Sequence, residues 1–314
     1  MGKFIRLGKP ALAKLAAFEQ ALNPQKPEGG PLGAKIIGYG EMSTVFRFSD
    51  ITLGKYAFKR MAIFHSADEV NNYRALYLQY HAELKKRGVE TPDYGCEIVS
   101  AANGRPVIYI LQALLGVKTI ANKRLHADSE RDNLRLYERI LTAIERVFAG
   151  NASSKNGIQL GFDGQISNWA YDRRLLYIDT STPLTRVHGI EQLDAELFLR
   201  ICPSYLVWII KLFFLKDVMA RYYDLRLVLI DTIANLYKEK RHDWVKNFVA
   251  RANAFLAVKH PHIKPIAENE VASYYKEDKF IWWLFLFFRK VERWVRTKIL
   301  RKRYEIILPE KIER

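Results

Sequence analysis

The sequence predicts an α+β fold with two lobes, a small β-rich first lobe and a larger helical second lobe. Apolar alternation with a period of two dominates the region 34–116. Helical periodicity dominates the region 117–314, with one β-like interruption at 157–184. The chain has 314 residues, of which 49% are hydrophobic. This is enough for one large two-lobed domain or for two ordinary ones, and it excludes a wholly disordered chain.

The elements expected in the first lobe are two helices, a linker and five strands. Residues 10–22 predict a short amphipathic helix with Pro10 in its first turn, and the Pro- and Gly-rich residues 23–33 predict a linker. A longer helix is expected over 68–87, with Gly88 as its left-handed cap. Strands are expected at 34–37, 43–48, 56–63, 94–100 and 106–114, and an Asn-Gly turn joins the last two.

The second lobe is expected to be mostly helical. Ser129 is suited to cap a helix whose apolar stripe ends at Gly150. No apolar run reaches the roughly 18–20 residues that cross a bilayer. The densest runs, Tyr205–Leu215 and Phe280–Phe288, are interpreted as buried helices. Further helices are expected over 191–201, 204–238, 242–258 and 278–303.

The charge of the chain indicates an anionic partner. Lys and Arg number 50 against 34 Asp and Glu, which gives a net charge of +16. Such a surface attracts nucleic acid, anionic lipid or phosphorylated small molecules. Cys96 and Cys202 provide neither a disulfide framework nor a zinc cluster, so a reducing cytoplasm is the expected compartment.

The basic residues are concentrated near the C-terminus. Eight of them lie between Arg289 and Arg303, directly after the aromatic-rich run Phe280–Phe288. An aromatic run followed by a basic helix suits an anionic membrane interface, and a peripheral location on the inner face of a membrane is therefore expected. The alternative is a final helix packed on the second lobe with a solvated basic side.

A glycine-rich turn is the first candidate for chemistry. Gly38 and Gly40 lie between two expected strands, and Ser43 follows them. Such a turn lets backbone N–H groups approach phosphate oxygens without side-chain clash. The motif is short, and taken alone it is also compatible with a plain hairpin turn.

Lys59, on the next expected strand, is the second candidate. A lysine in this position is suited to neutralise the phosphates of a nucleotide, although a solvent-facing strand lysine is the usual case. A carboxylate of the following helix normally fixes such a lysine. Glu69 is the choice for this role and Glu83 is the reserve.

Three polar residues form the most specific pattern. Asp163 and Asn168 are five residues apart, and Asp179 ends a short apolar strand eleven residues later. Asp163 is suited to accept the proton of an attacking hydroxyl, and Asn168 and Asp179 are suited to supply oxygens to magnesium. Each residue alone is also a common turn residue, but their order and spacing favour a joint role.

Together these motifs resemble the protein-kinase-like superfamily, and in particular its small-molecule branch, the aminoglycoside phosphotransferases and choline kinases. The matching elements run from Ile36 to Pro183. The resemblance implies a bilobal fold that binds ATP and Mg²⁺ between the lobes, with residues 34–116 as the N-lobe, 117–314 as the C-lobe and 1–33 as an added helix and linker. It implies a catalytic role for Asp163, metal binding by Asn168 and Asp179, and nucleotide binding by Gly38, Gly40, Ser43, Lys59, Glu69 and a hinge that includes Gln112 and Leu114.

The sequence departs from the family in places. Gly161-Phe162 stands where the family has a His-containing pair, Thr180-Ser181 follows the metal-binding aspartate, and the third loop glycine is missing. The expected function is transfer of the γ-phosphoryl group of ATP to a hydroxyl of a small-molecule or glycolipid acceptor. The alternatives are a nucleotide-binding pseudoenzyme and a basic nucleic-acid- or membrane-binding protein without catalysis. A nucleic-acid partner is disfavoured because no helix-turn-helix or zinc signature is present.

Overall fold

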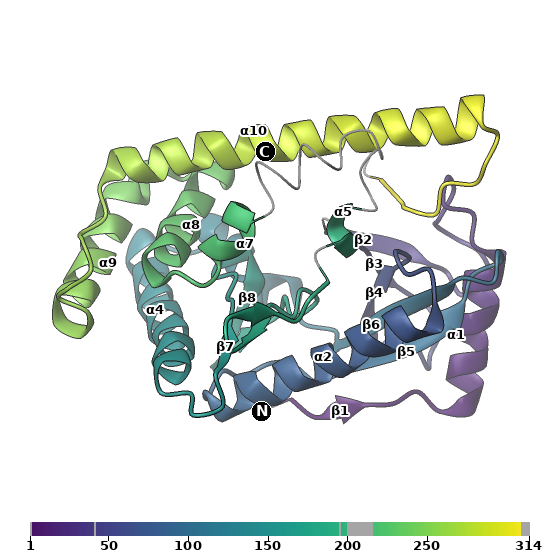
Figure 1. Ribbon diagram of the computed structural model, residues 1–314, viewed down its shortest axis with the longest axis horizontal. Coiled ribbons are helices and arrows are strands. Elements are labelled where there is room, and N and C mark those ends of the chain that lie inside the picture. Colours follow the sequence, from purple (N-terminus) through teal and green to yellow (C-terminus); the bar gives the residue numbers. More distant parts are fainter. Residues whose placement is uncertain (1, 41, 195, 200–215, 309–314) are drawn as a thin grey trace.

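A computed structural model gives the structure of the protein and describes residues 2–40, 42–194, 196–199 and 216–308. The first lobe contains a six-stranded sheet in the order β1-β5-β6-β4-β3-β2 (Figure 1). The β1–β5 pair is parallel and the other neighbouring pairs are antiparallel. The strands are β1 (Phe4–Ile5), β2 (Lys35–Tyr39), β3 (Thr44–Arg47), β4 (Tyr56–Met61), β5 (Tyr94–Ser100) and β6 (Pro106–Ala113). Five of them match the predicted strands, and the two-residue β1 is too short to show a periodic signal.

One helix covers each face of this sheet. Helix α1 (Lys9–Ala21) packs on the face that includes Phe58, and α2 (Ala67–Lys86) packs on the face that includes Met61. Both helices were predicted, and Gly88 ends α2 with a φ of 70° as expected. Because successive strand residues point to opposite faces, β4 contributes to both hydrophobic clusters. The consequence is that its polar residues also divide between the two faces.

The second lobe is built mainly from helices. Its core joins α4, α8 and α9, and the stretch Val228–Leu236 of α8 is buried throughout. Ser129 caps α4 as predicted, but the helix continues past Gly150, which does not have a positive φ. The main helices are α3 (Ala121–Ala127), α4 (Glu130–Ala152), α8 (Leu225–Lys238), α9 (Val245–Lys259) and α10 (Glu268–Trp294).

Short strands interrupt the helices between α4 and α8, as predicted. Strands β8 (Trp169–Asp172) and β9 (Arg174–Tyr177) form a hairpin. The other three strands form a small sheet in the order β11-β10-β7: β7 (Ile158–Leu160), β10 (Thr185–Val187) and β11 (Ile190–Glu191). The α+β class is therefore confirmed, with a β-sheet N-terminal region and a helical C-terminal part.

Two predicted helix boundaries were wrong. The helix predicted over 191–201 begins with β11 instead, and only the short α5 (Glu196–Leu199) is helical among its described residues. The helix predicted over 204–238 is broken before Asp224, whose side chain caps α8 by accepting a hydrogen bond from the Leu227 N–H. Before this break lies α7 (Lys216–Arg221). The predicted helix Tyr205–Leu215 and Cys202 lie outside the described residues.

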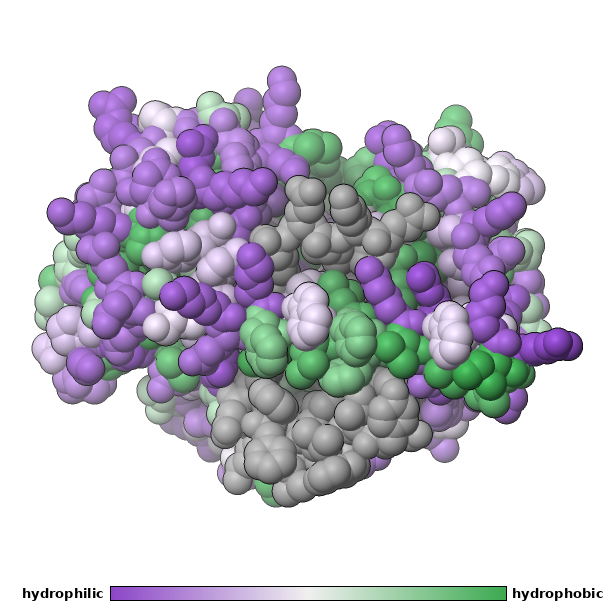
Figure 2. Space-filling model, turned by 90° about the horizontal axis from the view of Figure 1, so that it is seen from above, coloured by the Kyte–Doolittle hydropathy of each residue, from purple (hydrophilic) through white to green (hydrophobic). Residues whose placement is uncertain are grey.

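Helix α10 connects the two lobes. It begins at Glu268 rather than at 278 as predicted, packs on α8 and then extends across to the first lobe (Figure 1). A π-helical turn, Val295–Ile299, follows it. The chain then returns to the sheet, where the Arg60 guanidinium donates to the Glu305 carbonyl over 2.8 Å. Seen from above, apolar side chains gather on this face of the molecule (Figure 2). No helix among the described residues is long and apolar enough to cross a membrane.

Candidate functional site

Lys59 on β4 meets Asp179 just after β9. The Lys59 Nζ lies 2.7 Å from the Asp179 Oδ1 and also donates to the Ser181 hydroxyl. The side chains of Lys59 and Asp179 are 18% and 34% exposed, so the pair is accessible to solvent. This contact joins the sheet of the first lobe to the polar segment that follows the β8–β9 hairpin. Two of the residues predicted for one site are thereby brought together.

The glycine turn lies over this lysine. The Gly40 N–H donates to the Ser43 carbonyl over 2.9 Å. A Cβ atom at Gly40 would lie 2.5 Å from the Ser43 Oγ and 3.5 Å from the Lys59 Cε, so a side chain here would crowd the turn. A Cβ atom at Gly38 would make only an ordinary contact, 3.6 Å from Val45. Of the two glycines, Gly40 is therefore the one at which an added side chain would require Ser43 to move.

The carboxylates predicted to fix Lys59 have other partners in this structure. Glu69 accepts a hydrogen bond from the His65 N–H over 2.7 Å at the start of α2. Glu83 pairs with Lys86 at 2.6 Å and with Arg87. Lys59, which either glutamate was expected to contact, is paired with Asp179 instead.

Tyr73 of α2 reaches the segment beside Asp179. Its hydroxyl donates to the Ser181 carbonyl, and it is 3% exposed. Burial and the nearby Asp179 charge raise the pKa of Tyr73 well above its usual value, so the hydroxyl keeps its proton. A hydrogen bond from α2 to the segment after β9 therefore replaces the expected ion pair from α2 to β4.

The β8–β9 hairpin explains why Asn168 lies beside Asp179. Trp169 pairs with Tyr177 in the hairpin register, so the residues just outside this pair face each other. The Ile178 N–H accordingly donates to the Asn168 carbonyl over 2.8 Å. The four residue pairs of this hairpin thus place the two residues predicted to bind metal next to each other, in a region that the sequence indicated as β-like.

Asp163 lies on the loop before this hairpin, and the side chain of Asn168 hydrogen-bonds to its backbone. The Asn168 Nδ2 donates to the Asp163 carbonyl over 3.3 Å. The Gln165 N–H donates to the Asp163 Oδ1 over 3.2 Å, which orients the carboxylate. Asp163 is part-exposed, while Asn168 is 8% exposed. Asp163, Asn168 and Asp179 therefore belong to one connected polar segment.

Buried polar residues of α8 hold the same loop. The Thr232 hydroxyl donates to the Gly164 carbonyl over 3.0 Å, and the Asn235 Oδ1 accepts from the Ser167 N–H over 3.3 Å. Gly164 packs so closely on α8 that a Cβ atom there would lie 2.7 Å from the Thr232 hydroxyl. Asp231 accepts from the Gln165 side chain over 3.4 Å. The loop therefore rests on the buried stretch Val228–Leu236 of α8.

Aromatic packing takes the place of the missing histidine next to this loop. Phe162 is fully buried, and its ring lies 4.5 Å from the Tyr177 ring and 5.7 Å from the Trp169 ring. The Phe162 N–H also donates to the Tyr222 carbonyl over 2.8 Å. Three stacked or tilted rings supply packing here in place of a polar residue: Phe162 and the cross-strand pair Trp169 and Tyr177, at the end of the β8–β9 hairpin away from its turn.

The oxygen atoms of the site fit a magnesium ion. The hydrogen bonds to the Asp179 carboxylate are made to Oδ1, from Lys59 and Ser181, which leaves Oδ2 for a cation. Asn168 uses its Nδ2 as a donor, so its Oδ1 can face a metal. Desolvation opposes ionisation of Asp179, but the Lys59 charge and hydrogen bond outweigh it and keep the pKa of Asp179 below its usual value. The described residues contain no cluster of three or more His, Cys, Asp or Glu side chains suited to a metal, so a nucleotide would have to supply further oxygens.

The predicted hinge begins in the last two residues of β6. Gln112 lies in the sheet, opposite Ala57 and Tyr94. The Leu114 N–H donates to the Lys55 carbonyl over 3.0 Å, so this group is already used within the protein. An adenine ring would have to be recognised by other groups of this segment. The roles of Gln112 and Leu114 stay predictions.

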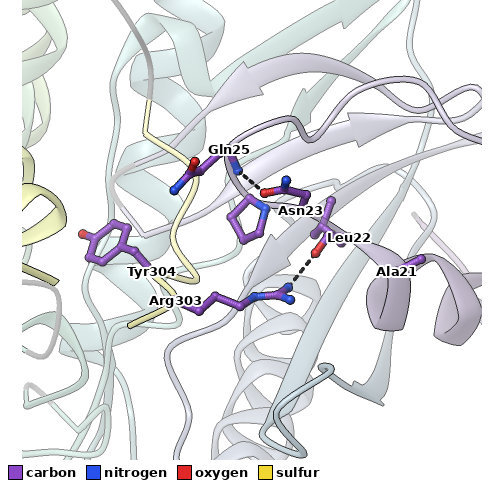
Figure 3. A pocket seen from close by; sticks show the side chains of 7 residues that line it. Ala21, Leu22, Asn23, Gln25, Arg303 and Tyr304 are labelled. Atoms are coloured by element: carbon purple, nitrogen blue, oxygen red, sulfur yellow. Dashed lines mark hydrogen bonds between the residues drawn. The ribbon is translucent and has the colours of Figure 1, made fainter. Parts of the chain in front are cut away.

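A separate hollow lies on the opposite side of the sheet from the Lys59–Asp179 pair. It has a volume of about 340 Å³ and lies where the end of α1 meets the C-terminal segment (Figure 3). The Arg303 guanidinium donates to the Leu22 carbonyl over 2.6 Å across it. None of the predicted site residues lines this hollow. Of the described residues that line it, Arg303 is the one charged residue, beside small apolar and amide residues and Tyr304, so we assign it no chemistry.

Comparison with known proteins places the chain in a family. The family described as "Family of unknown function (DUF6206)" matches residues 25–293. The chain belongs to this family. No curated protein matches the DUF6206 chain. Among solved structures, one titled "WaaP in complex with acyl carrier protein" matches with 14% identity and a TM-score of 0.33, covering 77% of this chain and 98% of the other. A similarity of this size supports no conclusion about fold or activity.

Sequence reasoning missed several residues of the site in this DUF6206 chain. Ser181 contacts both Lys59 and Asp179, and Asp231 supports the loop of Asp163. The sequence did contain a signal for Asp231 and its neighbours in α8, because Asp, Thr and Asn interrupt an otherwise apolar helix at 231–235. Buried polar residues must find hydrogen-bond partners, so such an interruption indicates a polar loop nearby.

Proposed function

We propose that the protein is a phosphotransferase of the protein-kinase-like type, which moves the γ-phosphoryl group of ATP to a hydroxyl of a small-molecule or glycolipid acceptor. The observation that supports this most directly is the Lys59–Asp179 contact of 2.7 Å. It brings a cation of the sheet to a carboxylate that is adjacent to Asn168 and to the loop of Asp163. Phosphoryl transfer depends mainly on positioning and charge stabilisation, and these residue types supply both.

Each residue has a defined role in this proposal. Lys59 and the backbone of the Gly40 turn hold the phosphates of the nucleotide. Asn168 and Asp179 hold the ion through carbonyl and carboxylate oxygens, which are the ligands that magnesium prefers. Magnesium, when bound, neutralises the charge that develops on the phosphates. Asp163 orients the acceptor hydroxyl and accepts its proton.

Gln165 and the α8 residues keep Asp163 in position for this task. The Gln165 N–H donates to the Asp163 Oδ1 over 3.2 Å, which helps to orient the carboxylate. The loop is also anchored on Thr232 and Asn235, so its backbone does not have to order when the substrate binds. A positioned base contributes about 10²–10⁴-fold to the rate.

The metal and nucleotide assignment is tested by calorimetry with ATP, with and without magnesium. We expect the unaltered protein to bind ATP more tightly when magnesium is present. Asp179→Ala should remove this magnesium-dependent gain. Asp172→Ala is the matched control, because Asp172 is an exposed aspartate at the turn of the same hairpin. Equal magnesium-ATP affinity in the unaltered protein and in Asp179→Ala would contradict the metal assignment.

The role of Asp163 is tested by phosphoryl transfer from labelled ATP to a panel of sugars, amino alcohols and glycolipids. Asp163→Asn keeps the oxygen that accepts from the Gln165 N–H but is a much weaker base. We expect transfer to fall about 10²–10⁴-fold while the affinity for ATP is unchanged. Unchanged transfer by Asp163→Asn would contradict the role of this residue as the base.

A nucleotide-binding protein without catalysis is the second candidate. It is favoured by the fact that Lys59 has its carboxylate partner in Asp179 and not on α2. In this case the protein would bind magnesium-ATP, and Asp179→Ala would weaken the binding. No acceptor would be phosphorylated, and slow ATP hydrolysis would be the same in Asp163→Asn. The binding and transfer experiments together therefore distinguish the two functions.

A further inference from the structure

Helix α10 carries exposed aromatic side chains on its outward side. Four large rings are between 49% and 57% exposed, and we name them the aromatic row: Phe280, Trp283, Phe287 and Trp294. Their spacing of three, four and seven residues places them on one side of an α-helix. Figure 2 views the molecule from above α10 and shows apolar side chains gathered between hydrophilic ones. Single exposed rings are ordinary, but a continuous row marks an interaction surface.

The first three rings of the aromatic row lie next to one another. The centres of the Phe280 and Trp283 rings are 6.2 Å apart, and those of Trp283 and Phe287 are 5.7 Å apart. The planes of the second pair differ by only 14°. Because the faces of these rings are turned toward one another, they are less suited to stack on separate nucleobases. A continuous apolar strip with tryptophan suits the headgroup level of a bilayer, where this residue is enriched.

The inward side of the same helix is already packed. Phe285 joins the hydrophobic cluster that includes Met61 and Tyr73. Arg289 is 2% exposed, and its guanidinium lies 5.3 Å from the centre of the Phe285 ring. The aromatic row is therefore not the core-facing side of a displaced helix. It is a second apolar side, directed away from the protein.

Exposed cations accompany the aromatic row. They are Lys279, Lys290, Lys298, Arg301 and Lys302. The acidic residue in this stretch, Glu292, is paired with Arg296. Arg289, which the sequence placed among the eight basic residues of this surface, is buried and has to be removed from that set. The remaining charge complements an anionic partner and opposes docking of a second copy through the same surface.

We propose that the aromatic row of α10 docks the protein on an anionic lipid bilayer, with the rings at the interface and the neighbouring cations on the headgroup phosphates. At a rise of about 1.5 Å per residue, the row from Phe280 to Trp294 extends over about 21 Å. A helix with this pattern lies in the plane of the interface. The proposal does not depend on phosphoryl transfer, and it would stand if the protein bound no nucleotide.

The apolar part of the surface is tested by sedimentation of the full chain with vesicles. The vesicles contain phosphatidylcholine alone or a mixture of phosphatidylcholine and phosphatidylserine, at low and at high salt. We expect binding to the mixed vesicles and a loss of about tenfold or more in the double variant Trp283→Ser/Phe287→Ser. The matched control is Ile51→Ser/Val258→Ser, which removes apolar side chains that are 85% and 78% exposed elsewhere. This control should bind as the unaltered protein does.

The charged part is tested in the same assay. Lys290→Glu/Lys298→Glu should weaken binding to the mixed vesicles at low salt by about tenfold or more, because each cation near an anionic surface contributes. Lys155→Glu/Lys246→Glu makes the same change at exposed lysines of other elements and is the control. The binding that remains in the aromatic variant should disappear at high salt, where electrostatic attraction is screened.

Three results would overturn the proposal. The first is no binding of the unaltered protein to the mixed vesicles at low salt. The second is an equal loss of binding in the control variants. The third is a dimer in sedimentation velocity, or a DNA complex in fluorescence anisotropy, that Trp283→Ser/Phe287→Ser abolishes while vesicle binding is unchanged. Circular dichroism and thermal unfolding would verify that each variant is folded, as expected for substitutions at exposed positions.

Discussion

Lys59 and Arg60 are neighbours on β4, and both pair with a carboxylate, yet they form two different kinds of site. Strand alternation sends Arg60 toward α1 and Lys59 toward the segment after β9. Arg60 and its partner Glu19 are 3% and 0% exposed, whereas Lys59 and Asp179 are 18% and 34% exposed. We call the buried Arg60–Glu19 pair the closed pair and the part-exposed Lys59–Asp179 pair the open pair.

The hydrogen bonds show what this difference means. Glu19 accepts from Arg60 with both oxygens, at 2.6 Å and 2.7 Å, and it also accepts from the Tyr109 hydroxyl. The bonds to Asp179 converge on one oxygen and leave the other for a ligand. A buried ion pair with all its bonds made holds a fold together, while a part-exposed pair with an uncommitted oxygen can bind.

Arg60→Ala should have the largest effect on stability. It leaves the Glu19 carboxylate buried without its cation, which costs about 3–5 kcal/mol in other proteins. Chemical denaturation followed by circular dichroism measures this loss. Arg174→Ala is the control, because Arg174 forms a 3.1 Å pair with Glu90 but is 61% exposed, and an exposed pair contributes at most about 1 kcal/mol. Equal losses of stability in the two variants would contradict the idea that burial of the Arg60–Glu19 pair determines its contribution.

Tyr109→Phe should have the next largest effect. The variant removes one hydrogen bond to the Glu19 carboxylate, and a hydrogen bond to a charged group contributes about 1.5–3 kcal/mol. Tyr137→Phe is the matched control, because the Tyr137 hydroxyl is also buried but has no hydrogen-bond partner in the structure. Removing that hydroxyl should be neutral or stabilising. The same denaturation measurement compares the two, and a larger loss in Tyr137→Phe would contradict the assigned contacts.

Asp231 is a buried carboxylate that, unlike Glu19, has no ion-pair partner among the described residues. Desolvation and the Asp163 charge raise the pKa of Asp231 well above its usual 3.8. The folded protein therefore binds this proton more tightly than the unfolded chain, and this group makes stability fall as the pH rises above about 4. Asp231→Asn keeps the acceptor for Gln165 and should flatten the dependence. Unfolding midpoints measured from pH 4 to 8 test this, and an unchanged slope would contradict the raised pKa.

Lys59→Met should have the smallest effect on stability and the largest effect on the proposed nucleotide binding. The open pair is part-exposed, so its loss should change the unfolding free energy by no more than about 1 kcal/mol. Calorimetry should show weaker magnesium-ATP binding by the same variant. A loss of stability as large as that of Arg60→Ala would show that the open pair holds the fold, which would weaken its interpretation as a binding site.

The sequence by itself determined the elements of the fold and the order of the polar residues. The alternation of β2–β6, the stripe of α4 and the caps at Ser129 and Gly88 depend on neighbours along the chain, which a sequence shows directly. The pattern Asp163, Asn168 and Asp179 was visible for the same reason. One hairpin joins the last two, so their proximity follows from local pairing.

The tertiary structure alone decided the partners of charges that are distant in sequence. Lys59 and Asp179 are 120 residues apart, and the choice of Asp179 over Glu69 depends on how α2 packs on the sheet. The burial of Arg289 and the outward direction of the aromatic row likewise depend on which side of α10 the first lobe covers. A helical pattern specifies that two sides exist, but only packing specifies which side meets the protein and which side is left for a partner.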